Sequence, residues 1–331
     1  MAGWKNQGMP AEPLDLPKDL DVLQILLDRR DRGTYAGGHG DGHKVAIVVG
    51  GGGMRGGSTG GMVLALEEAG LTDCFDIAYG SSSGAFIASA MIHRRGEAAS
   101  RVFREDMSEK EFIDLKRLWQ RSPVMSLDHL LGEILTHRKP IDWDEALEHR
   151  TPMQIVVTDA DTLEPVAISD LSSRERWERA YKATSAVPGL AGGAVEIDGR
   201  RYVDGSVSEP LPAMRAIRDG ATHVLALVSW SEETLLRHEV GLYANVERKA
   251  LDGVVKGLGG MAQGRLHYAR EITALRKADA RTYAMANPVS TGVRSLTRDL
   301  PKLERDAALG YVTAQAALYR ALTGDRERRR P

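Results

Sequence analysis

Three short motifs carry residue types that can perform acyl transfer, and the first is centred on Ser82. Residues 80–84 read Gly-Ser-Ser-Ser-Gly, a GxSxG pattern between an apolar run at 77–79 and a helical stretch expected from about 83 to 93. A strand, a sharp turn and a helix in that order hold a serine hydroxyl above a sheet edge, beside the positive end of the helix. Gly80 and Gly84 permit the tight turn. The pattern therefore predicts Ser82 as a nucleophile.

The second motif is a glycine loop, GGGGMRGG at residues 50–57, directly after the β-branched run VAIVV at 45–49. Consecutive glycines let backbone N–H groups approach a ligand, and the following helix adds its own unpaired N–H groups. Such a loop suits a phosphate or the oxyanion of an acyl-transfer intermediate. Residues 51–56 also satisfy GxGxxG, the fingerprint of dinucleotide-binding proteins.

The third motif is Asp204-Gly205, after the strand-like RRYV at 200–203. Alone it reads as a turn, but a serine nucleophile needs a base, and Asp204 is the candidate. Some serine hydrolases carry their catalytic residues in the chain order serine, acid, histidine, and in these the base is a histidine downstream of the acid. None of the three that follow Asp204 lies in an obvious catalytic loop, and we expect ordinary structural or surface roles for them: His223, His238 and His267.

The elements that must position these motifs alternate between strand and helix. Further strands are predicted at 153–158, 165–169 and 223–229, and a hairpin is predicted around Asp198-Gly199. Helices are expected at 62–69, 174–185, 242–276 and 302–324, the last ending just before Gly324. Strands separated by helices predict an α/β fold with a mainly parallel central sheet covered on both faces.

Composition shifts along the chain predict its organisation. We expect an N-terminal appendage and linker at 1–43, a catalytic core at 44–230, a mostly helical part at 231–324 that packs on the core, and a basic tail at 325–331.

Composition also excludes several functional classes. The 331 residues carry a net charge of −2 and 5% aromatic residues, which argues against a nucleic-acid partner. One cysteine and no signal-like or 18-residue apolar stretch predict a cytoplasmic protein, with at most peripheral membrane contact. No metal-ligand spacing occurs, and the pair Asp159 and Asp161 reads as part of a turn. We therefore expect no metal and no cofactor. Oligomeric state is not indicated.

Taken in order, the three motifs resemble the patatin-like phospholipase family. The resemblance spans roughly residues 45–230 and includes the block from Ala183 to Pro188 and the segments 115–131 and 156–162. It implies a three-layer α/β/α fold and hydrolysis of lipid carboxylic esters, as by a phospholipase A or lysophospholipase. The implied dyad is Ser82 with Asp204 and no histidine. The implied oxyanion and support residues are Gly51, Gly52, Gly53, Arg55 and Gly56, with Gly80, Gly84 and Gly205 supporting the elbow and dyad.

The implied dyad poses a physical problem, because a free aspartate has a pKa near ~3.9 and is a weak base. Burial can raise that pKa, a short hydrogen bond can assist, or the serine alkoxide can be stabilised directly. Two glycine-rich helix starts are expected to converge on Ser82, so we expect alkoxide stabilisation to dominate.

Three alternatives stay open at this level. A dinucleotide-binding protein would use Gly51, Gly53 and Gly56 with an acidic residue such as Asp73 or Asp76. A histidine-dependent triad esterase or an acyltransferase would share the elbow. A non-enzymatic interaction protein could retain the fold alone.

Overall fold

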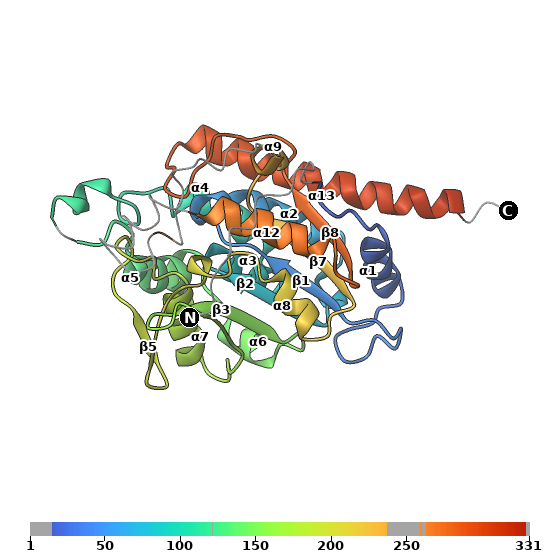
Figure 1. Cartoon of the computed structure of the whole chain (residues 1–331), viewed down its shortest axis with the longest axis horizontal. Helices are drawn as coiled ribbons and strands as arrows, with labels where there is room; N and C mark the ends of the chain where they lie inside the picture. Colours follow the sequence, from blue (N-terminus) through green and yellow to red (C-terminus); the bar gives the residue numbers. More distant parts are fainter. Residues whose placement is uncertain (1–14, 121, 237–258, 260–262, 329–331) are drawn as a thin grey trace.

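The computed structural model describes residues 15–120, 122–236, 259 and 263–328. Its sheet has eight strands in the order β5-β6-β3-β2-β1-β7-β8, with β4 paired to β3 (Figure 1). The pairs β3-β2, β2-β1, β1-β7 and β7-β8 are parallel, whereas β4, β5 and β6 join antiparallel. The predicted mainly parallel α/β sheet is therefore confirmed. The strands are β1 (Val45–Val49), β2 (Ile77–Ser81), β3 (Met153–Asp159), β4 (Pro165–Ile168), β5 (Val195–Ile197), β6 (Arg200–Asp204), β7 (His223–Val228) and β8 (Arg281–Ala286).

Strand β1 shows why the fold has three layers. All five of its residues are buried, and successive side chains point to opposite faces of the sheet. Val45, Ile47 and Val49 join a core with apolar side chains of α1, α2, α3, α4, α7 and α13. Ala46 and Val48 join a second core with side chains of α8, α9 and α12. Helices thus cover both faces, as the three-layer expectation required.

The helices of the described chain are of several kinds. The α-helices are α1 (Asp21–Asp31), α2 (Gly56–Glu68), α3 (Ser83–Ile92), α4 (Gly96–Glu105), α5 (Leu127–His129), α6 (Trp143–Glu148), α7 (Arg174–Thr184), α8 (Ala213–Arg218), α9 (Glu232–Leu236), α12 (Gly264–Leu275) and α13 (Leu300–Arg328). Short 3₁₀ turns form η1 (Gly53–Arg55), η2 (Thr72–Cys74), η3 (Leu115–Leu118) and η5 (Gly205–Val207), and η4 (Leu130–Arg138) is a π-helix.

One strand was not predicted, and one predicted helix end was wrong. Within the segment predicted to be mostly helical, residues 281–286 form β8, a buried edge strand that pairs with β7. Helix α13 continues past Gly324 to Arg328, and its C-terminal part extends from the body at the right of Figure 1. Within the predicted helix 242–276, the structure describes only residue 259 and residues from 263 onward.

Several local predictions were confirmed. The hairpin of β5 and β6 turns at Asp198 and Gly199, whose φ angles of 50° and 75° are the positive values that a two-residue hairpin turn requires. Asp159 and Asp161 lie in a turn, where Asp159 Oδ1 accepts the Asp161 N–H at 2.9 Å.

The division into appendage, core and C-terminal part stays a prediction. Helix α1, within the predicted appendage, buries Val22, Leu23, Leu26 and Leu27 in the main core. Its Arg29 is fully buried and pairs with Asp41 at 2.7 Å and with Asp76 at 2.8 Å. No helix in the described ranges is both long enough and apolar enough to span a bilayer.

Candidate active site

Ser82 occupies the strained turn that the GxSxG pattern predicts. It caps α3 with φ 53° and ψ −131°, a conformation that costs a non-glycine residue of the order of 1–3 kcal/mol and is typical of functional sites. A Cβ at position 80 would meet the backbone of Ala85, and one at position 84 would meet the Val49 carbonyl. The two glycines are therefore needed for close packing beneath the turn.

The sheet register brings Ser82 to Asp204. Ser81 pairs with Val156 across β2 and β3, and Val157 pairs with Asp204 across β3 and β6. Residues 122 positions apart in sequence thereby meet, and the Ser82 Oγ donates to Asp204 Oδ2 at 2.8 Å. The Asp204 carboxylate is thus placed to accept the proton of the Ser82 hydroxyl.

The carboxyl of Asp204 is fully buried, and this burial raises its pKa from the ordinary value to about 7. Hydrogen bonds oppose the rise, because the N–H of Ser206 donates to Oδ1 at 2.8 Å and Ser82 donates to Oδ2. The side chain of Ser206 is small, and its backbone N–H keeps the hydrogen bond to Asp204. Burial therefore supplies one of the three ways in which an aspartate becomes a useful base.

Thr184 positions the nucleophile, a role that sequence reasoning missed. Its Oγ1 accepts the Ser82 N–H at 2.8 Å and donates to the Val156 carbonyl at 2.6 Å. The hydroxyl satisfies two buried backbone groups and ties α7 to the elbow. The block 183–188 was noted in the sequence, but the pairing of Thr184 with Ser82 depends on tertiary packing.

Of the five residues predicted for the oxyanion hole, three have N–H groups that donate to backbone carbonyls. Those of Gly51, Arg55 and Gly56 donate to the carbonyls of Pro210, Gly52 and Gly53, respectively. The Gly52 N–H donates to the Ser83 Oγ at 3.1 Å, a hydroxyl that can rotate away. For Gly53 N–H no acceptor is found among the described residues. Gly52 and Gly53 are therefore the N–H groups that a ligand can engage.

Two residues missed in the sequence hold the glycine loop. The Gly51 carbonyl accepts hydrogen bonds from Tyr268 Oη at 2.6 Å and from Ser229 Oγ at 2.7 Å. Tyr268 comes from α12 and is fully buried, so it fixes the loop from the opposite layer. No local pattern links a tyrosine 217 positions away to this loop.

Arg55 is held by an aromatic ring and not by a carboxylate. Its guanidinium lies 3.8 Å from the ring centroid of Trp230, and its buried Nε has no hydrogen-bond partner in the described chain. No carboxylate of the described residues lies within salt-bridge distance. Burial lowers the pKa of Arg55 to about 10, so it stays cationic at neutral pH. The structural ion pair that arginine usually forms is not observed here.

A cavity of about 320 Å³ joins these groups. Ser82, Asp204, Gly52, Gly53 and Arg55 are among the residues that line it. The rest of its wall is largely apolar, from Phe86, Val102, Phe103, Phe112, Leu130 and Leu135. An apolar cleft with few convergent polar groups is the usual form of a small-molecule site.

The groups that the alternatives would need lie elsewhere. Asp76 accepts from Arg29, and Asp73 pairs with Arg94. His223 begins β7, whose partner β1 is parallel to β2, so this histidine lies at the sheet edge opposite to Ser82. His267 Nδ1 lies 3.3 Å from the Ser208 carbonyl, and His238 is outside the described residues. Over the described ranges, no group of three or more acidic, histidine or cysteine side chains could hold a metal.

Comparisons with known proteins agree with this arrangement. A family model described as patatin-like phospholipase matches residues 47–217, slightly more than half of the chain. The chain is 28% identical over 187 residues to the uncharacterized protein YjjU of Escherichia coli K12, covering 56% of this chain and 51% of that protein. It thus spans about half the length of this curated relative.

Two solved structures are similar at lower levels. VipD from Legionella pneumophila has 14% identity and a TM-score of 0.46, over 84% of this chain and 67% of that one. Human GIVD cytosolic phospholipase A2, in complex with methyl gamma-linolenyl fluorophosphonate, has 16% identity and a TM-score of 0.44, over 96% and 66%.

Proposed function

Because this chain belongs to the patatin-like phospholipase family, we propose that it is a serine hydrolase of lipid carboxylic esters with a Ser82-Asp204 dyad. The observation that carries the proposal is the 2.8 Å hydrogen bond from Ser82 Oγ to a buried carboxylate, in the wall of a largely apolar cavity. Cleavage of the phospholipase A or lysophospholipase type is the specific activity that we propose.

The proposed reaction has two steps. Ser82 Oγ attacks the ester carbonyl while its proton passes to Asp204, and the tetrahedral oxyanion accepts hydrogen bonds from the Gly52 and Gly53 N–H groups. Collapse expels the alcohol, which takes the proton from Asp204 and leaves an acyl-Ser82 ester. Water then attacks this ester, Asp204 accepts its proton, and the fatty acid leaves as Ser82 regains its hydrogen.

The positive end of α3 also adjoins the attacking oxygen, because Ser82 is the residue that caps this helix. The raised pKa of Asp204 makes it a stronger base than a free aspartate, although a fully ionised carboxylate is required for the first step. Burial and alkoxide stabilisation thus act on the same proton transfer.

A fluorophosphonate probe tests whether Ser82 is activated. We expect covalent labelling at Ser82, mapped by mass spectrometry, and its loss in Ser82→Ala. The neighbouring Ser81→Ala is the matched control, since Ser81 is also a buried serine, at the end of β2, and its substitution should leave Ser82 labelled. Absence of labelling, with and without lipid vesicles, would count against the hydrolase and favour the non-enzymatic alternative.

Arg55 provides a test of phospholipid as substrate. A cationic guanidinium in the cavity wall, with Trp230 as its neighbour and no carboxylate of the described residues paired to it, is available to a lipid phosphate. Arg55→Ala should lower kcat/KM on phospholipid by about tenfold to a hundredfold more than on a neutral ester, since hydrogen bonds to charged groups contribute about 1.5–3 kcal/mol. Arg55→Lys keeps the charge and should retain part of the selectivity. Equal losses on both substrates would assign Arg55 to support of the glycine loop.

We also propose peripheral contact with the membrane and a cytoplasmic location. Trp119, directly after the short helix η3, is 92% exposed, and Leu115 of η3 is 56% exposed beside Lys116 and Arg117. The base of this segment is fixed by the pairing of Ile113 with Met125, and Met125 lines the catalytic cavity. Trp119→Ala should reduce co-sedimentation with anionic vesicles. Equal co-sedimentation of the wild type and Trp119→Ala would show that Trp119 does not contribute to membrane contact.

A further inference from the structure

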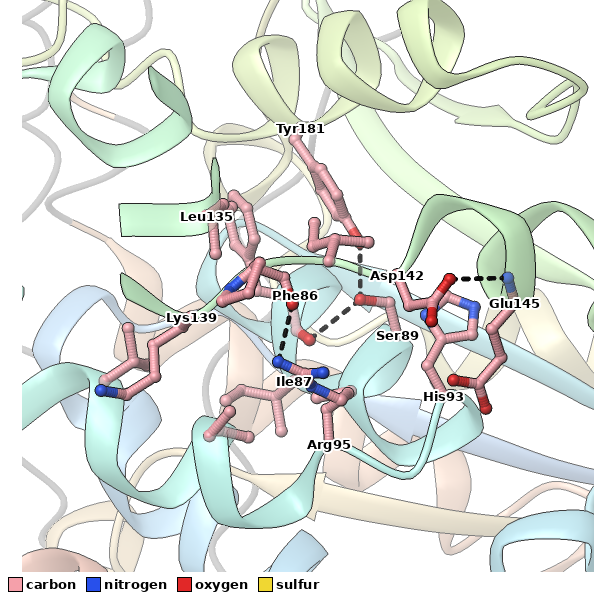
Figure 2. Close-up of a pocket in the computed structure, with 16 residues that line it drawn as sticks. Phe86, Ile87, Ser89, His93, Arg95, Leu135, Lys139, Asp142, Glu145 and Tyr181 are labelled. Atoms are coloured by element: carbon pink, nitrogen blue, oxygen red, sulfur yellow. Dashed lines mark hydrogen bonds between the residues drawn. The ribbon is translucent and has the colours of Figure 1, made fainter. Parts of the chain in front are cut away.

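A second, smaller cavity of about 70 Å³ lies beside the catalytic cavity, along α3 (Figure 2). Much of its wall is apolar and comes from α3, α4 and the segment before α6, including Ile87, Ala90, Ala98 and Ile141. Four charged residues, Arg95, Lys139, Asp142 and Glu145, also contribute to the lining. The apolar part of the wall can accept hydrocarbon.

The two cavities share one partition. Phe86, Val102 and Leu135 line both of them. Phe86 is the fourth residue after Ser82, the N-cap of α3, so it lies about 6 Å further along the helix axis. Leu135 comes from the π-helix η4, a form found frequently at functional sites. The partition thus combines residues of α3, α4 and η4, and its Phe86 lies four residues from the nucleophile.

Phe86 is fixed in this partition by α7. Its ring stacks on Tyr181 with centroids 4.4 Å apart, and Tyr181 Oη donates to Ser89 Oγ at 2.6 Å, one turn further along α3. Figure 2 shows Phe86 beside Leu135, with the Tyr181–Ser89 hydrogen bond on its other side. The Phe86 ring is therefore held in one position between the two cavities, and its size limits the space that connects them.

We infer that the second cavity binds the distal part of the substrate's acyl chain, and that Phe86 determines the chain length that is accepted. The inference rests on the proposed function, because the carbonyl end must lie at Ser82. Ala90 follows Ser82 by eight residues, or about 12 Å along the helix, so only a long chain reaches it. Each methylene that enters contributes roughly a fourfold gain in binding.

Chain-length profiles of substituted proteins test this assignment. Ala90→Phe fills the second cavity and should lower the ratio of kcat/KM for p-nitrophenyl palmitate over butyrate by at least about tenfold, the equivalent of two lost methylene contacts. Phe86→Ala opens the partition and should raise that ratio. In the double variant, Ala90→Phe should cancel the gain. Ala90→Leu is a milder filling variant that should act in the same direction if Ala90→Phe does not fold.

Phe112→Ala is the matched control, because Phe112 lines the catalytic cavity alone. If Phe112→Ala raises the ratio of kcat/KM for palmitate over butyrate, that gain should persist when Ala90→Phe is added. A ratio unchanged by both Ala90 variants, or a Phe86→Ala gain that survives Ala90→Phe, would overturn the inference while ester hydrolysis still stands.

A binding measurement separates this inference from the proposed function. The fluorescent fatty acid cis-parinarate is titrated into Ser82→Ala protein, which needs no turnover. Weaker binding after Ala90→Phe supports the acyl site even if no ester is cleaved. Unchanged binding rejects it even if esters are cleaved.

Discussion

Asp204→Asn should lose about a thousandfold or more in kcat/KM on any ester that the protein cleaves, while keeping its fold. The amide fills the same space but cannot accept the Ser82 proton, and general-base assistance is worth about 10²–10⁴. The 2.8 Å hydrogen bond that Ser82 Oγ donates to Asp204 Oδ2 is the reason why we propose Asp204 as the base. Steady-state kinetics of the purified variant, with circular dichroism to verify folding, give the result.

Asp306→Asn is the matched control for this substitution. Asp306 is also a buried carboxyl, whose burial raises its pKa to about 6, but its hydrogen-bond partners are Asn287, Thr291 and the backbone of Ser58 and not Ser82. We expect the kcat/KM of Asp306→Asn to stay close to that of the wild type, because this carboxyl makes no hydrogen bond to Ser82. Wild-type turnover in Asp204→Asn would remove Asp204 as the base and restore the histidine alternative.

Activity should depend strongly on pH through the same group. Burial raises the pKa of Asp204 to about 7, and only the ionised form accepts a proton from Ser82. Below about pH 7, kcat/KM should therefore fall about tenfold for each pH unit, and above it the profile should be flat. A profile that stays flat down to about pH 5 would show that Asp204 titrates near its ordinary value.

Stability should depend on pH in the opposite sense. Because the pKa of Asp204 is raised in the folded state, the folded protein binds more protons than the unfolded chain between about pH 4 and pH 7. The free energy of unfolding falls across this window, by up to roughly 4 kcal/mol from Asp204 alone. Asp204→Asn removes this loss of stability. The melting temperature of the variant minus that of the wild type should therefore be larger at about pH 8 than at about pH 5.

The difference in melting temperature between the wild type and Asp204→Asn isolates the contribution of Asp204 to the pH dependence of stability. Burial also raises the pKa of Glu271 to about 7 and that of Asp306 to about 6, but both groups are present in each protein and largely cancel in the difference. A melting-temperature difference that does not change with pH would contradict the buried, proton-accepting carboxyl.

The sequence by itself determined the local elements of the site. Short runs of adjacent residues specify three of these elements: the strand at 45–49, the GxSxG turn and the Asp198-Gly199 hairpin. The structure contains each of them. Chain order and the turn chemistry of glycine suffice for such features, because strand and turn preferences depend mostly on neighbours in sequence. The mainly parallel sheet also followed, since alternating strands and helices have few ways to pack.

Local reading failed where tertiary context overrides it. The strand β8 has no clear alternation of polar and apolar residues, and five of its six residues are buried because β8 lies under helices at the sheet edge. The end of α13 was placed at Gly324, but a single glycine costs a helix only about 1 kcal/mol, and the helix continues to Arg328.

Only the tertiary structure decided how the site works. The register of three strands brings Ser82 and Asp204 together across 122 positions, and burial beneath that contact raises the pKa of the carboxyl. Packing between layers placed Thr184 on the Ser82 N–H, Tyr268 on the Gly51 carbonyl and Trp230 on Arg55. These contacts join residues far apart in the chain, and their existence depends on desolvation and close packing, which no stretch of neighbouring residues specifies.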